Sequence, residues 1–203
     1  MIIYYTENFM GGRAESRRLL RKSIAEYTGD AKRAEELVSG LQTGENGKPY
    51  IEGFDCFSVS HTGGIWAVLI DIRECGLDIQ LGRKADVPAI SRRIYAQPDA
   101  DKIAALQEED PVKAADEFFR LWARREALTK ALGGTVYDTG LPSVMADELS
   151  VNCASYRISD VSFPDTGLED GKKLYAAVCV ESGKETEDKS SELRPVYVGL
   201  NEG

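Results

Sequence analysis

Hydrophobic and polar residues follow two kinds of pattern along this chain. Short runs such as residues 65–70 are almost wholly apolar or alternate with a period of two, as β-strands do. Longer segments repeat apolar residues every three or four positions, as helices do. The longest has Pro111 at its start and Gly133 just past its end, which is typical of helix boundaries. The patterns predict strands at residues 1–5, 50–51, 56–60, 65–70, 77–81, 150–158, 174–180 and 196–198, and helices at residues 14–27, 31–39, 88–95, 100–107 and 111–132.

The order of these elements predicts the fold class. A helical region followed by strands occurs twice, with a boundary near residues 72–76. This order is typical of an α+β fold. We therefore expect residues 1–75 and 76–203 to form two similar halves. Residues 181–192 are polar and charged, so we expect a loop or a disordered link there.

Two of the predicted elements carry polar residues at regular spacing. Asp78 and Gln80 alternate with aliphatic residues, so a strand would turn both side chains to one face. Trp122, Glu126 and Lys130 recur every four residues, so a helix would stack them along one side. Carboxylate and amide oxygens are ligands that Mg²⁺ accepts while it keeps waters and substrate phosphates. If the strand and the helix face each other, these side chains would form a site for a metal ion and a phosphate.

Four motifs in one order resemble the 4′-phosphopantetheinyl transferases of the surfactin-synthetase type, in the holo-acyl-carrier-protein synthase superfamily. They are Gly-Lys-Pro at 47–49, Phe-Ser-Val-Ser-His-Thr at 57–62, Gly-Leu-Asp-Ile-Gln at 76–80 and W-x-x-R-E-A-x-x-K-x-x-G at 122–133. The resemblance implies a pseudo-dimer of two α+β halves with the active site in the seam. The N-terminal half would bind coenzyme A, and the C-terminal half would hold the metal and the catalytic residues. The implied reaction moves 4′-phosphopantetheine from coenzyme A to a serine of an apo acyl or peptidyl carrier protein and releases adenosine 3′,5′-bisphosphate.

The resemblance also implies roles for the catalytic residues. Asp78 and Glu126 would bind Mg²⁺, with Mn²⁺ as an alternative, and Gln80 would be a third ligand. Glu126 or a metal-bound water would take the proton from the carrier serine, and Lys130 would offset charge on the α-phosphate. Without the resemblance, a solvated surface role for Asp78 and Glu126 is equally open, because exposed carboxylates are usually only solvated.

Two positions depart from the family pattern. Many relatives carry glutamate where this chain has Gln80, so a neutral amide replaces a negative ligand. A surface role for Gln80, or one behind the ligands, is as open as ligation. Arg125 stands where the family often has lysine, and the two cations differ in geometry.

Coenzyme A contacts are implied in the N-terminal half. Ser60 and His61 would contact the cofactor phosphates, and Lys48 would lie along its adenine and ribose end. Arg17 and Arg21, one helical turn apart, would meet the 3′-phosphate. Each residue also has a simpler interpretation, because a lone histidine is usually structural, Gly-Lys-Pro forms turns, and basic helix faces are usually solvated.

The amino-acid composition argues against some classes of function. The 203 residues are 42 % hydrophobic and 29 % charged, as in ordinary globular proteins, with a formal net charge of -9. That charge argues against nucleic-acid and anionic-membrane binders. No apolar stretch suits a signal peptide or a membrane span, so we expect a cytoplasmic protein. Two halves in one chain lead us to expect a monomer. The four cysteines are far apart, which favours reduced and mostly buried thiols; they are Cys56, Cys75, Cys153 and Cys179.

The acidic charge complicates docking of carrier proteins, which are generally acidic as well. We therefore expect a local basic patch containing Arg92, Arg93 and Arg124 near the seam. Two other functions stay open. One is a coenzyme A-binding protein with lost or weak transfer, suggested by Gln80. The other is a noncatalytic α+β interaction module in which Trp122 only fills the core.

Overall fold

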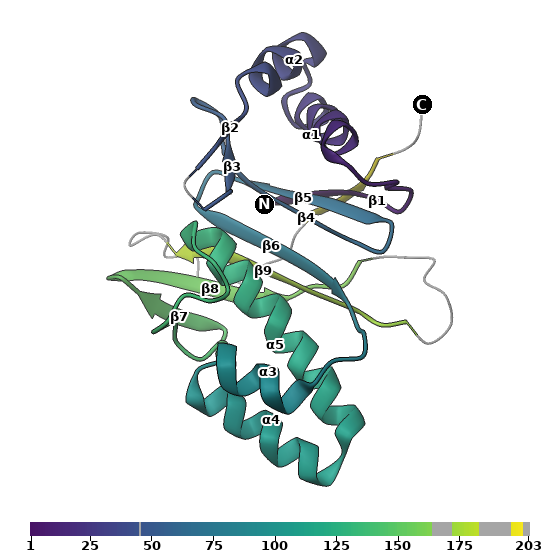
Figure 1. The fold of residues 1–203 in the computed structure, drawn as a ribbon. Coiled ribbons are helices and arrows are strands. Elements are labelled where there is room, and N and C mark those ends of the chain that lie inside the picture. The colour runs from purple at the N-terminus through teal and green to yellow at the C-terminus, as the bar shows by residue number, and fades with distance from the viewer. Residues whose placement is uncertain (45, 164–171, 183–195, 201–203) are drawn as a thin grey trace.

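The computed structural model describes residues 1–44, 46–163, 172–182 and 196–200. In this described part of the chain, the strands form two four-stranded sheets and one two-stranded hairpin, with helices packed on both sheets. Figure 1 shows the two sheets next to each other, with α1 and α2 on the outer side of the first sheet and α5 lying across the second. The α+β fold class predicted from the sequence is confirmed.

The first sheet has the strand order β10-β1-β5-β4. Its central strands are antiparallel, with Ile2 opposite Ile70, while β10 runs parallel to β1. One face packs against α1 and α2 through residues such as Trp66, Leu20 and Ile24. The elements of this half are β1 (Ile2–Thr6), α1 (Arg13–Thr28), α2 (Ala31–Ser39), the hairpin β2 (Gln42–Thr43) and β3 (Pro49–Tyr50), β4 (Cys56–Thr62), β5 (Ile65–Asp71) and β10 (Val196–Gly199).

The second sheet has the order β6-β9-β8-β7, and all its neighbouring strands are antiparallel. α5 packs on it, and α3 and α4 pack on α5. Asp110 caps the start of α5 by accepting hydrogen bonds from two amides of the first turn, and Gly133 ends the helix at a positive φ of 68°. The elements are β6 (Cys75–Leu81), α3 (Val87–Ile94), α4 (Gln97–Glu109), α5 (Pro111–Leu132), β7 (Glu148–Val151), β8 (Ala154–Asp160) and β9 (Leu174–Ser182).

A shared core joins the two sheets. Ile3 and Leu69 of the first sheet pack in one buried cluster with Leu77, Ile79 and Val178 of the second. These side chains are almost fully buried. The two sheets therefore form one structure, and the residues at their meeting line are held firmly relative to each other.

Some predicted elements differ from the structure. The run 150–158 is not one strand but the hairpin β7–β8, because Asn152 and Cys153 turn the chain at positive φ angles of 50° and 66°. Asn is tolerant of this conformation, and the two-residue turn suits a hairpin. The last strand, β10, belongs to the first sheet although it follows the expected boundary at residues 75 and 76. Within the expected loop 181–192, the first two residues end β9, and 183–192 lie outside the described residues.

Other expectations concern thiols and membranes. The four cysteines are free; Cys75 and Cys179 are buried, Cys56 is half-buried and Cys153 is exposed on the β7–β8 turn. Among the helices that the structure describes, none combines the length and the apolar character needed to cross a membrane.

Candidate active site

The candidate site lies where β4 of the first sheet runs beside β6 of the second. Both are edge strands, and side-chain hydroxyls of β4 take the place of a backbone ladder between them. The hydroxyl oxygens of Ser58, Ser60 and Thr62 accept hydrogen bonds from successive alternate amides of β6, at 3.0, 3.1 and 3.3 Å. The alternation of small hydroxyl residues in the sequence at 58–62 thus satisfies the edge of β6.

Asp78 and Lys130 form an ion pair in this seam. The Lys130 Nζ atom lies 2.7 Å from Asp78 Oδ1, and it also donates to the Leu77 carbonyl at 3.1 Å and to the Ser60 hydroxyl at 3.2 Å. The Ser60 hydroxyl donates in turn to Asp78 at 3.0 Å. Burial raises the pKa of the Asp78 carboxyl, while Lys130 and Ser60 oppose that rise. The strand and helix motifs therefore face each other, which is the condition that the sequence left open for a metal and phosphate site.

Glu126 lies one helical turn before Lys130 on α5. Burial, together with the nearby carboxylate of Asp78, raises the pKa of Glu126 to about 7. Two neighbouring carboxylates whose pKa values are raised by burial favour binding of a cation. Glu126 and Lys130 also line a cavity of about 400 Å³ whose other walls include residues 46–49 of the hairpin, residues 58–59 of β4 and residues 133–137.

The expected third ligand, Gln80, is only half-buried. Its Nε2 atom donates to the Leu81 carbonyl at 2.7 Å, which leaves the amide oxygen as the group able to bind a metal. Within the described residues, no cluster of three or more histidine, cysteine, aspartate and glutamate side chains is suitable for a metal. Two carboxylates and an amide oxygen still fit Mg²⁺, which completes its six ligands with waters and phosphates.

A second cavity of about 400 Å³ adjoins the first and shares Pro49 and Val59 with it. Its lining includes Arg13, Arg17 and His61. The Nη2 atom of Arg17 donates to the Val38 carbonyl at 2.6 Å, and the exposed His61 ring packs on Phe9 with 5.1 Å between centroids. This cavity therefore carries cationic side chains at one end of α1.

The two expected arginines of α1 are placed differently. Arg17 lines the second cavity, whereas Arg21 does not; its guanidinium lies 2.6 Å from the carboxylate of Glu35 on α2. Arg13, at the start of α1, lines the cavity instead, although its sequence position gave no sign of this. Helix spacing alone could not indicate which arginine of α1 lines the cavity, because the cavity is formed by four segments that are separate in the sequence.

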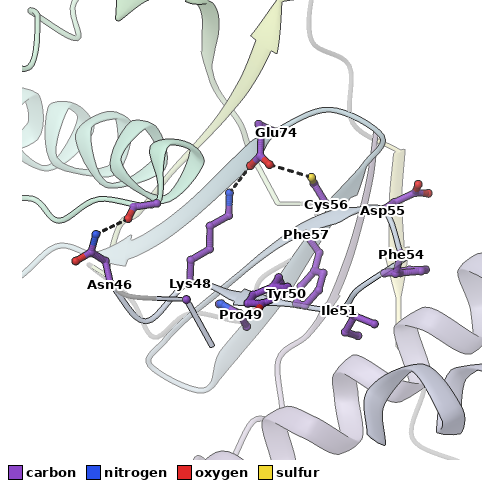
Figure 2. A pocket seen from close by; sticks show the side chains of 12 residues that line it. Asn46, Lys48, Pro49, Tyr50, Ile51, Phe54, Asp55, Cys56, Phe57 and Glu74 are labelled. Atoms are coloured by element: carbon purple, nitrogen blue, oxygen red, sulfur yellow. Dashed lines mark hydrogen bonds and ion pairs between the residues drawn. The ribbon is translucent and has the colours of Figure 1, made fainter. Parts of the chain in front are cut away.

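Lys48 lies between the halves. Its Nζ atom is 2.7 Å from Glu74 Oε2 and donates to the Ala131 carbonyl at 3.1 Å, and Figure 2 shows the side chain reaching from the hairpin to Glu74. Cys56 also contacts Glu74, and burial and this carboxylate raise the pKa of the thiol to about 11. That thiol is therefore protonated at neutral pH and is a weak nucleophile.

The expected basic patch is only partly present. Arg92 and Arg93 are exposed at the end of α3, but Arg124 is 1 % exposed. Its guanidinium donates to the carbonyls of Val144 and Ala146 and pairs with Asp147 at 2.8 Å. The prediction that Arg124 belongs to a docking surface was wrong, because the helix turns this side chain toward the loop after α5, whose carbonyls it binds.

Comparison with known proteins gives the family of one segment. Residues 74–161, which contain β6 and α5, match the 4′-phosphopantetheinyl transferase superfamily. The resemblance is thus confirmed at the level of the superfamily over this segment. The surfactin-synthetase type is a finer assignment than this match makes.

Individual relatives agree with that segment. Over 128 residues the chain is 30 % identical to a putative 4′-phosphopantetheinyl transferase of Haemophilus influenzae, covering 60 % of this chain and 52 % of the relative. Over 112 residues it is 30 % identical to the 4′-phosphopantetheinyl transferase AcpT of Salmonella typhi, covering 51 % and 57 %. The AcpT of Salmonella typhimurium is 31 % identical over 112 residues with the same coverage. The chain spans about half the length of the relatives it matches.

Proposed function

We propose that this protein is a Mg²⁺-dependent 4′-phosphopantetheinyl transferase of the surfactin-synthetase type. It moves the 4′-phosphopantetheine arm of coenzyme A to a serine of an apo acyl or peptidyl carrier protein, and adenosine 3′,5′-bisphosphate leaves. The single observation that carries the proposal is the Asp78–Lys130–Glu126 cluster at the seam, inside the segment that matches the superfamily.

The two adjoining cavities support coenzyme A as the donor. One is lined by Glu126 and by Lys130, whose ammonium suits a diphosphate, and the other is lined by Arg13, Arg17 and His61, which suit a further phosphate. Pro49 and Val59 form the shared wall between them. A long ligand with phosphates at two places fits this pair of cavities better than a small single-site ligand does.

The donor set suits a divalent cation. Asp78, Glu126 and the amide oxygen of Gln80 would hold Mg²⁺, or Mn²⁺ in its place. When bound, the cation neutralises charge that develops on the diphosphate. Lys130, already at the seam, donates an ammonium hydrogen to an oxygen of the phosphate under attack, and Glu126 accepts the proton of the serine hydroxyl.

The packing of the sheets supports a pseudo-dimer. Each half contributes a four-stranded sheet covered by helices, and the candidate site lies where the edge strands β4 and β6 meet. Arg92 and Arg93 are exposed at the end of α3, and the Arg93 guanidinium lies over the ring of Tyr137, which lines the first cavity; both arginines are suitable contacts for an acidic carrier.

The test is intact-mass analysis of a panel of apo carrier proteins after incubation with this protein and coenzyme A, with and without Mg²⁺. Glu126→Gln removes the base, and Glu108→Gln on the exposed face of α4 is the matched control. We expect a Mg²⁺-dependent gain of one phosphopantetheine that Glu126→Gln loses and Glu108→Gln keeps. Absence of any gain on every carrier, despite binding of coenzyme A, would support a binding protein that has lost transfer, and Gln80→Glu would then test whether the missing carboxylate is the cause.

A further inference from the structure

We infer that Lys48 is a positioning residue, which pins the β2–β3 hairpin to the end of α5, and not a ligand of the substrate. This inference rests on the proposed function, since it concerns the geometry of the same site. The Nζ atom of Lys48 makes both of its contacts within the protein, to Glu74 Oε2 at 2.7 Å and to the Ala131 carbonyl at 3.1 Å. Figure 2 shows the side chain reaching from the hairpin to Glu74, which directly precedes β6.

The contact with Ala131 uses a general property of helices. The last four carbonyls of an α-helix have no partner inside the helix, and this end of the helix carries partial negative charge. The Ala131 carbonyl belongs to that group, because α5 ends at Leu132. An ammonium hydrogen therefore satisfies an oxygen that would otherwise need water.

A second tie joins the same two elements. The Asn46 Nδ2 atom donates to the Gly133 carbonyl at 2.8 Å, one residue past the end of α5. Asn46 and Lys48 are two residues apart on the hairpin, and their acceptors are two residues apart on the chain. The hairpin is thus fastened to α5 at two neighbouring points, which restricts rotation as well as separation.

Charge balance argues against a ligand role for Lys48. Glu74 already neutralises the ammonium, and the Lys48 side chain is only 21 % exposed. An anion that reached Nζ would find two of its three hydrogens already engaged, one of them by a carboxylate at 2.7 Å. Lys48 does line the cavity that contains Glu126 and Lys130, but its Nζ atom is held there by Glu74, whereas Arg13 lines the neighbouring cavity with an exposed side chain.

The pinned elements are the two that form the site. The hairpin contributes Pro49 to both cavities, and α5 carries Glu126 and Lys130. The Lys48 tie therefore sets the distance between the wall that holds the donor and the residues that carry out transfer. Small displacements of this kind reduce the rate of the chemical step more than they reduce binding.

A double-mutant cycle tests the inference. The variants are Lys48→Met, which keeps the aliphatic stem, Glu74→Gln, which keeps the shape of the carboxylate, and the two together. Lys113→Met removes an exposed ammonium at the other end of α5 and is the matched control. The measurements are kcat, KM for coenzyme A, the calorimetric Kd for coenzyme A, and hydrogen exchange of the hairpin amides.

A positioning role predicts that Lys48→Met lowers kcat about tenfold or more and changes the Kd for coenzyme A by less than about twofold. Glu74→Gln then also lowers kcat, and the kcat of the double variant is no lower than that of Lys48→Met alone. Hydrogen exchange of the hairpin amides is faster in each variant. A ligand role predicts the reverse: a Kd raised about tenfold or more in Lys48→Met, with Glu74→Gln unchanged or tighter because it frees the ammonium. That second result would overturn the inference.

Failure of the proposed function can be distinguished from failure of the inference about Lys48. It appears in the unmodified protein as absence of both coenzyme A binding and transfer. Hairpin exchange in Lys48→Met still tests the tie in that case: unchanged exchange overturns the inference, and faster exchange supports it. If Lys48→Met does not fold, Glu74→Gln carries the same comparison, because it weakens the same ion pair.

Discussion

Gly76 and Ala127 lie in direct backbone contact across the candidate site. A β-carbon on Gly76 would be 1.9 Å from the Ala127 carbonyl oxygen and 2.6 Å from the Ala131 amide nitrogen. Only glycine therefore lets α5 approach β6 this closely. The approach brings Lys130 of the helix to Asp78 of the strand, so the glycine that opens the strand motif has a packing role in the site.

Gly76→Ala is expected to push α5 away from β6. Because backbone atoms are in the way, the variant should be destabilised by about 1–3 kcal/mol, and transfer should fall further than the loss of folded protein explains. Urea unfolding and transfer assays on the folded fraction measure the two effects. Gly40→Ala is the control, since its β-carbon would meet only the Leu37 carbonyl oxygen, at 3.5 Å. Unchanged stability and activity in Gly76→Ala would show that the close approach is dispensable.

Glu126→Gln is expected to stabilise the protein above neutral pH while it abolishes transfer. The pKa of Glu126 rises from 4.5 to about 7 on folding, so the folded state retains a proton that the unfolded state has lost. The free energy of unfolding therefore falls as pH rises from 4.5 to 7. Glutamine does not titrate, so Glu126→Gln avoids about 1–2 kcal/mol of this loss above pH 7. Unfolding free energies of both proteins at pH 5 and pH 8, without divalent metal, measure the effect. A constant difference between the two pH values would contradict the assignment.

Arg125→Lys is expected to loosen the loop after α5. Arg125 is 4 % exposed, and its guanidinium donates to the carbonyls of Val136 and Asp138, at 3.1 and 2.9 Å. A lysine keeps the charge but lacks the planar fork that reaches both oxygens, so we expect a loss of about 1–3 kcal/mol. Residues 133–137 line the cavity with Glu126, and KM for coenzyme A or carrier should rise.

Arg33→Lys is the control for that measurement, because Arg33 is exposed on α2. Thermal unfolding and steady-state kinetics of both variants give the comparison. Equal behaviour of the two variants would mean that the loop does not depend on the guanidinium fork.

Glu117→Gln is expected to reduce stability at neutral pH and not in strong acid. Hydrogen bonds from Arg120 and Lys102 lower the pKa of Glu117 from 4.5 to about 2. The stabilisation is therefore present above pH 4.5 and is lost as pH falls toward 2. After a discount for solvent screening, the contribution of Glu117 to the free energy of unfolding is about 1 kcal/mol. Urea unfolding between pH 3 and pH 7 should show the two proteins converging in acid, with Glu108→Gln behaving as the unmodified protein does.

Local patterns predicted much of the site. Alternation placed Asp78 and Gln80 on one face of a strand, and four-residue spacing placed Glu126 and Lys130 on one face of a helix. The observed β6 and α5 contain these residues, and the helix bounds 111–132 agree with the sequence prediction. Such periodicity is a property of neighbouring residues, so no knowledge of the tertiary structure is needed to read it.

Patterns of this kind did not identify several interactions. Arg124 looked like a surface cation, yet it binds loop carbonyls more than 15 residues further along the chain. The run 150–158 looked like one strand, because a turn of Asn and Cys lacks the usual glycine signal. Nothing in the sequence distinguished Arg13 from the neighbouring arginines, because the cavity that it lines is formed by four segments that only the fold brings together.

What the sequence determined by itself was therefore the type of each element and the face on which its polar residues lie, since both follow from backbone geometry and hydrophobic periodicity. Only the tertiary structure decided which faces meet. The pairing of Lys130 with Asp78 and that of Lys48 with Glu74 and Ala131 join segments far apart in the chain. Such partners are selected by burial of the shared core between the two sheets, an energy that depends on the whole fold and not on any one segment.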